Sequence, residues 1–120
     1  FEKINDSIIV GMILETSAAL NDLENIVSVP GLDLIVVGPW DMALSMGLDP
    51  RKLPLPEVDD IIARVVDMTS DTQIAVGAGS VTPDGLTKLQ DEGIRFLSYG
   101  PDYALLVKSA KMGLAAFRQH

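Results

Sequence analysis

Short apolar runs alternate along this chain with segments whose apolar residues recur at helical spacing. The runs are rich in β-branched residues, which is typical of strands covered on both faces. We expect four strands, at residues 8–14, 32–37, 73–76 and 94–99. We expect four helices, at residues 17–27, 56–68, 83–92 and 102–117, of which three begin with caps at Ser17, Thr82 and Asp102. Strand-helix units in succession predict a parallel sheet with right-handed crossovers.

Such units can close in two ways, as a small open sheet with helices on both faces or as half of a (β/α)8 barrel. A complete barrel usually has about 250 residues, roughly twice the length of this chain. The chain begins at Phe1 without an initiator methionine, which favours a start inside a domain. Half a barrel would expose unpaired strand edges and an apolar inner face, so we also expect self-association.

Composition narrows the class of protein. With 48% hydrophobic residues, the 120-residue chain can bury one core. The sequence shows neither an apolar stretch near the roughly 20 residues of a membrane span nor a basic leader, so we expect a soluble protein without membrane contact. The lack of cysteine fits the cytoplasm. A net charge of −8 disfavours nucleic acid as a partner, because phosphate backbones are repelled.

Two carboxylates come directly after apolar runs. Glu15 follows the first run, and Asp41 follows the second after the break Gly38-Pro39. Because the carboxyl ends of neighbouring parallel strands share one edge, we expect both side chains at the same rim. Two carboxylates a few ångström apart repel by about 4 kcal/mol at an effective dielectric of 20. A hard divalent cation such as Mg²⁺ or Mn²⁺ would relieve this repulsion, so the sequence predicts a metal site.

Other interpretations of the same residues stay open. Asp41 could cap a short helix that begins at Met42, and Glu15 could be an exposed cap before Ser17. Trp40 could cover the end of the core or line a pocket.

A glycine-containing segment, residues 77–80, precedes the helix expected after Thr82. A glycine loop at a helix start can bind an anion, and barrels often hold phosphate near their last strands. This gives a second enzyme hypothesis, a phosphate-binding barrel. Asp33 and Asp102 are expected to be structural.

Four segments together resemble the C-terminal half of the HpcH/HpaI class II pyruvate aldolases: residues 12–15 (MILE), 19–26 (ALNDLENI), 29–33 (VPGLD) and 38–47 (GPWDMALSMG). The resemblance implies a (β/α)8 barrel lyase that uses Mg²⁺, Mn²⁺ or Co²⁺ to cleave or form 2-oxo acids through a pyruvate enolate. Residues 1–120 would then be one aldolase-like domain without the N-terminal half of the barrel.

The resemblance also implies roles for individual residues. Glu15 and Asp41 would be the metal ligands, and backbone amides around Gly38, Pro39, Trp40 and Asp41 would hold the pyruvate carboxylate. Substrates would be a 2-oxo acid and an aldehyde, and the protein would be a homo-oligomer. The family's acid/base histidine and its arginine come from the N-terminal half, so no catalytic residue is expected in this chain, His120 included. These 120 residues alone are therefore expected to lack aldolase turnover, and a non-catalytic half-barrel or assembly module is an alternative.

Overall fold

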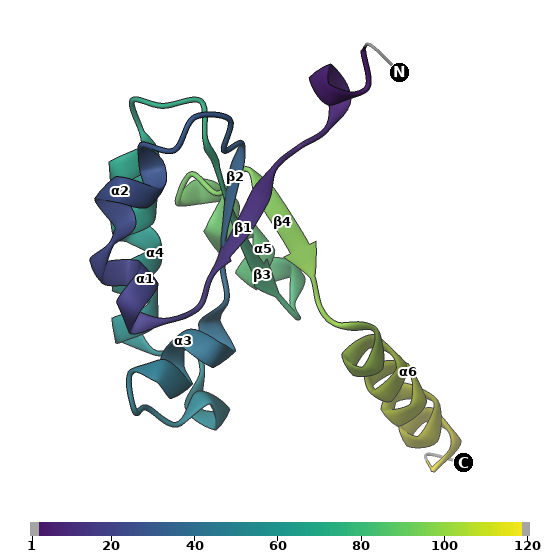
Figure 1. Cartoon of the computed structure of the whole chain (residues 1–120). Coiled ribbons are helices and arrows are strands. Elements are labelled where there is room, and N and C mark those ends of the chain that lie inside the picture. Colours follow the sequence, from purple (N-terminus) through teal and green to yellow (C-terminus); the bar gives the residue numbers. More distant parts are fainter. Residues whose placement is uncertain (1–2, 119–120) are drawn as a thin grey trace.

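The computed structural model describes residues 3–118 and contains one parallel sheet of four strands with helices between them (Figure 1). The strands are β1 (Gly11–Leu14), β2 (Leu34–Val37), β3 (Ala75–Ser80) and β4 (Phe96–Tyr99). Their order in space is their order in sequence, and every neighbouring pair is parallel. Consecutive strand order with βα units is the arrangement of a (β/α)8 barrel, so the half-barrel prediction is confirmed.

Six α-helices and two 3₁₀ turns connect and flank the strands in the described residues. The helices are α1 (Ser17–Asn21), α2 (Leu23–Val27), α3 (Pro39–Ser45), α4 (Pro56–Thr69), α5 (Pro83–Asp91) and α6 (Asp102–Phe117). The 3₁₀ turns are η1 (Asn5–Ser7) and η2 (Pro50–Lys52).

The helix starts follow local rules, with two corrections. Thr82 caps α5 as expected, because its Oγ1 accepts a hydrogen bond from the Gly85 amide at 3.1 Å. The cap of α1 is Thr16 rather than Ser17, since Oγ1 of Thr16 accepts from the Ala19 amide. Pro101, not Asp102, precedes α6 at the capping position. The residue at the capping position is the one whose backbone is still extended, just before the helix begins. In both corrected cases this residue lies one position earlier in the sequence than expected.

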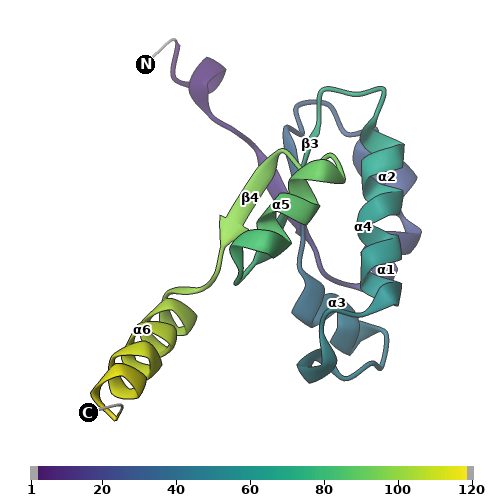
Figure 2. The ribbon, with the colours of Figure 1, turned by 180° about the vertical axis from the view of Figure 1, so that it is seen from behind.

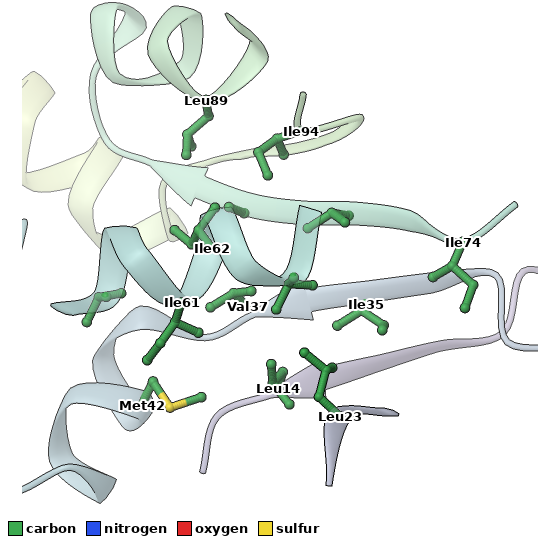
Figure 3. Packing of buried hydrophobic residues seen from close by; sticks show 14 of the residues in the cluster. Leu14, Leu23, Ile35, Val37, Met42, Ile61, Ile62, Ile74, Leu89 and Ile94 are labelled. Atoms are coloured by element: carbon green, nitrogen blue, oxygen red, sulfur yellow. The ribbon is translucent and has the colours of Figure 1, made fainter. Parts of the chain in front are cut away.

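The core lies between one face of the sheet and the helices that cover it (Figure 3). Val58, Ile61, Ile62 and Val65 form the buried face of α4, and Leu23 of α2 is 0% exposed. These are apolar positions that the helical periodicity identifies. Each fully buried aliphatic side chain contributes about 1.5–3 kcal/mol to folding, so this layer holds the helices on the sheet.

The opposite face of the sheet is open, which corrects the prediction of strands covered on both faces. Ile13 is 59% exposed and Phe96 is 49% exposed, although both lie within strands. All helices that pack on the sheet do so on the other face, so the open, doubly wound alternative is excluded (Figures 1 and 2). In a closed barrel this open face would be the interior.

Strand boundaries also differ from the sequence prediction. Residues 8–10 lie outside β1, because pairing with β2 begins at Gly11 and Leu34. Asp33 lies just before β2, and its Oδ2 accepts a hydrogen bond from the Val10 amide, just before β1, at 2.8 Å. This bond confirms a structural role for the Asp33 carboxylate. At the other end, β3 continues to Ser80 because it pairs with β4 as far as Tyr99.

Helix α6 extends away from the rest of the molecule in both views (Figures 1 and 2). Its apolar side chains face solvent, as Leu106 at 71% exposure and Phe117 at 80% exposure show. Within residues 3–118, no helix has the length and hydrophobicity that a membrane crossing requires.

Candidate metal and substrate site

The two predicted carboxylates follow neighbouring strands. β1 and β2 pair in register at Leu14 and Val37, so their carboxyl ends meet at one edge of the sheet. Glu15 is the residue directly after β1 and is partly buried. Asp41 lies in the first turn of α3, which begins two residues after β2 ends, and is exposed. The tertiary structure thus brings the two segments that carry these carboxylates to the same edge.

Glu15 lies against the backbone of Gly38. The Gly38 amide donates to the carbonyl of Leu14 at 3.0 Å, which carries the β1–β2 pairing one step past the strands. A Cβ atom at Gly38 would lie 3.2 Å from Cβ of Glu15 and 3.5 Å from its Oε2. A side chain at this position would crowd Glu15, and glycine leaves the Glu15 side chain room beside the backbone.

Asp41 is held by a short helix rather than by the loop that the Gly-Pro break suggested. Gly38 is at the capping position, Pro39 begins α3, and Asp41 is in its first turn, so Asp41 is not the cap itself. Met42 and Ala43, both 0% exposed, anchor the helix in the core. The strand end and this anchor together determine where the Asp41 backbone lies.

Two backbone donors remain available at the start of α3. The Gly38 amide is engaged with Leu14, and Pro39 has no amide hydrogen. The first intrahelical bond runs from Met42 to Gly38, and no capping side chain bonds this helix start in the described structure. Of the four residues that the sequence assigns to substrate binding, Trp40 and Asp41 thus offer amides that could bind an anion.

Trp40 does not cover the core. It is 51% exposed and lies outside the buried cluster and the partly buried side chains that pack on it. The indole stands on the same short helix as Asp41, one residue away, at the edge where β1 and β2 end.

The two carboxylates at this rim, Glu15 and Asp41, take no part in the ion pairs of the described residues. Within residues 3–118, no group of three or more His, Cys, Asp or Glu side chains is arranged to hold a metal. The prediction uses only two protein carboxylates, with water and substrate as the other ligands.

An ion-paired lysine lies elsewhere. Nζ of Lys88 on α5 donates a hydrogen bond to Oδ2 of Asp59 on α4 at 2.9 Å, and this bond raises the pKa of Lys88.

The glycine segment at residues 77–80 is not a loop. It forms the last four of the six residues of β3, and Ala78 is buried against the helices at 2% exposure. The structural premise of a glycine loop for phosphate is therefore wrong. The apolar run 73–76 gave no sign of this, because the extension depends on pairing with β4.

The sequence did not predict a contact between two serines near the rim. Ser17 and Ser45 hydrogen-bond each other across 28 residues of sequence, beside the segments that carry Glu15 and Asp41. Their only signal in the sequence is position: Ser17 is two residues after Glu15, and Ser45 is one helical turn after Asp41.

Comparison with known proteins defines the class. Residues 2–109 match the HpcH/HpaI aldolase/citrate lyase family, and the chain belongs to this family. A curated relative, the 2-keto-3-deoxy-L-rhamnonate aldolase of Escherichia coli strain K12, is 30% identical over 116 residues. The match covers 97% of this chain but 43% of the relative, so the chain spans less than half the length of that enzyme.

Solved structures show the same fold. An HpcH/HpaI aldolase/citrate lyase family protein from Burkholderia cenocepacia superimposes with a TM-score of 0.85 at 27% identity, covering 98% of this chain and 45% of that one. The HpcH/HpaI aldolase of Desulfitobacterium hafniense superimposes with a TM-score of 0.89 at 20% identity, covering 99% of this chain and 46% of that one. At 20% identity the second likeness concerns the fold alone.

Proposed function

We propose that this chain carries the metal-binding and carboxylate-binding rim of a metal-dependent aldolase, a lyase that cleaves or forms 2-oxo acids through the enolate of pyruvate. The observation that carries the proposal is the placement of Glu15 and Asp41 after the ends of two adjacent parallel strands. Family membership and the aldolase relatives support the reaction class.

The donor set fits a hard divalent cation. Carboxylate oxygens without thiolate suit Mg²⁺, Mn²⁺ or Co²⁺, which keep waters and small ligands in their remaining positions. Glycine at position 38 leaves the Glu15 side chain uncrowded, since an added Cβ would lie 3.2 Å from Cβ of Glu15. When bound, the ion would supply Lewis-acid stabilisation of negative charge on the substrate's keto oxygen.

The chain's own groups would bind and orient the substrate. The amides of Trp40 and Asp41 lie at the start of a helix and would donate hydrogen bonds to the carboxylate of a 2-oxo acid. Trp40, half exposed beside them, would limit the space next to that carboxylate. Cleavage would break the bond between C3 and C4, releasing an aldehyde as the C4 hydroxyl loses its proton, while C3 of the pyruvate unit gains one. We assign neither proton transfer to a residue of this chain.

The proposed rim needs the rest of a barrel and a partner copy. The open sheet face and the exposed apolar side chains of α6 support assembly with further βα units and a homo-oligomer. The composition supports a cytoplasmic location.

Metal binding tests the proposal directly. We expect the full-length protein to bind Mn²⁺, followed by electron paramagnetic resonance, and to bind it more tightly with oxalate as an analogue of the pyruvate enolate. Glu15→Gln and Asp41→Asn should each weaken the affinity at least about 100-fold, because a direct ligand matters more than the outer partners whose loss costs about 10–100-fold.

Glu24→Gln is the matched control, because it removes one exposed carboxylate in α2 away from the rim. It should leave Mn²⁺ binding unchanged. Equal affinity in the wild type and in both rim variants, or no Mn²⁺ binding by the wild type, would refute the proposed site.

A further inference from the structure

Two serines join the segments that carry the proposed metal ligands. The Ser17 amide donates to Oγ of Ser45 at 2.8 Å, and Oγ of Ser17 donates to the Ser45 carbonyl at 3.2 Å. The two hydroxyl oxygens are 3.1 Å apart. All three contacts are compatible when Oγ of Ser45 accepts from the Ser17 amide and donates its own hydrogen to Oγ of Ser17.

Each serine satisfies a backbone group that the other helix leaves without a partner. Ser17 is the first residue of α1 and Ser45 is the last residue of α3. Helix starts have unpaired amides and helix ends have unpaired carbonyls. Thr16 already satisfies the Ala19 amide, and Ser45 supplies the acceptor for the Ser17 amide. The contact therefore joins the start of one helix to the end of another (Figure 1).

The contact lies close to both carboxylates along the chain. Ser17 is separated from Glu15 by Thr16 alone, and Ser45 lies four residues after Asp41 on α3. Residues four apart share one face of a helix. The serine contact thereby attaches the turn after β1 to α3, the helix that carries Asp41. The other side of α3 is anchored in the core.

We propose that Ser45 is a positioning residue for the metal site, whose hydroxyl fixes the turn after β1 against α3 and so sets the spacing of Glu15 and Asp41. This inference rests on the metal site proposed above. Small divalent ions demand short oxygen distances and near-octahedral geometry, so the spacing of two ligands on different elements affects affinity directly.

Mn²⁺ affinity of the full-length protein tests the inference without turnover. Ser45→Ala should weaken binding about tenfold, at the low end of the roughly 10–100-fold loss typical of outer partners. Ser45→Thr keeps a hydroxyl and should retain affinity within about twofold, because the geometry of the contact is preserved. Ser17→Ala should lose about threefold, since it leaves the amide bond to Ser45 in place.

Ser28→Ala is the matched control. Its hydroxyl bonds the Asn25 carbonyl at 2.7 Å, after α2 and at the opposite end of the sheet from Glu15. This variant should bind Mn²⁺ like the wild type, whatever it does to the melting temperature.

The outcomes separate the two proposals. If the wild type binds Mn²⁺ and Ser45→Ala binds it equally well, with only a lower melting temperature, the serine contact is structural and the inference is overturned. If Ser45→Ala does not fold, wild-type affinity in Ser17→Ala overturns it instead. If the wild type binds no Mn²⁺, the proposed metal site is wrong and this inference falls with it.

Discussion

Replacing Gly38 by alanine should separate metal binding from folding. The new Cβ would lie 3.2 Å from Cβ of Glu15 and 3.3 Å from Cγ2 of Ile13, both closer than ordinary contacts. Those side chains must move by a few tenths of an ångström. Because Cβ of Glu15 is fixed to its own backbone, rotation of the side chain does not relieve this contact. The backbone just after β1 must shift instead, and the carboxylate moves with it.

The cost to folding should be modest. Alanine can adopt the backbone conformation of Gly38, with φ −91° and ψ 92°. Because alanine makes the unfolded chain less flexible, the substitution by itself stabilises the folded state by about 0.4–1 kcal/mol. Turning the Ile13 side chain about 30° from its rotamer, which moves Cγ2 away, costs about 0.5–1.5 kcal/mol, and alanine caps a helix less well than glycine does. We therefore expect the free energy of unfolding to fall by about 1 kcal/mol. Mn²⁺ affinity should fall about 10-fold or more, because a ligand is displaced.

Urea unfolding followed by circular dichroism and Mn²⁺ titration measure the two quantities separately. Gly113→Ala is the control, since a Cβ there meets nothing within 4 Å and the residue lies inside α6. It should leave Mn²⁺ affinity unchanged and favour the helix slightly. Wild-type affinity in Gly38→Ala would show that the space above Gly38 does not place the Glu15 carboxylate for metal binding.

Two further predictions concern stability. Leu23→Ala should lower the free energy of unfolding by about 2–5 kcal/mol, because Leu23 is 0% exposed, whereas Leu106→Ala at a position 71% exposed should change it by less than about 0.5 kcal/mol; equal effects in urea unfolding would contradict the core. Lys88→Met should remove the contacts with Asp59 and Glu92. Since the folded pKa of Lys88 is raised, the wild type's advantage should be constant from about pH 7 to 9 and decline above about pH 10.4; an advantage that grows in alkali would be inconsistent with this pairing.

Local signals predicted much of the secondary structure. Proline at the first position places the starts of α4 and α5, and the cap at Thr82 is where the sequence indicates. The apolar face of α4 follows from its periodicity. These features depend on residues within one or two helical turns of each other, so they can be predicted from the local sequence.

Features that depend on distant segments were harder to predict. β3 extends to Ser80 because β4 lies beside it, and β1 begins only at Gly11, where β2 is available to pair. A run of apolar residues does not contain this information. Likewise, Asp41 lies inside a helix turn because Met42 and Ala43 find space in the core.

The sequence by itself determined the alternation of strands and helices, the buried face of α4, and the two carboxylates that follow apolar runs. Only the tertiary structure decided that the helices cover one face of the sheet, that Glu15 lies over Gly38, and that Ser17 meets Ser45. The reason is the range of the interactions. Periodicity and capping act between residues close in sequence, whereas strand pairing, packing space and contacts between helix ends exist only after distant segments have come together.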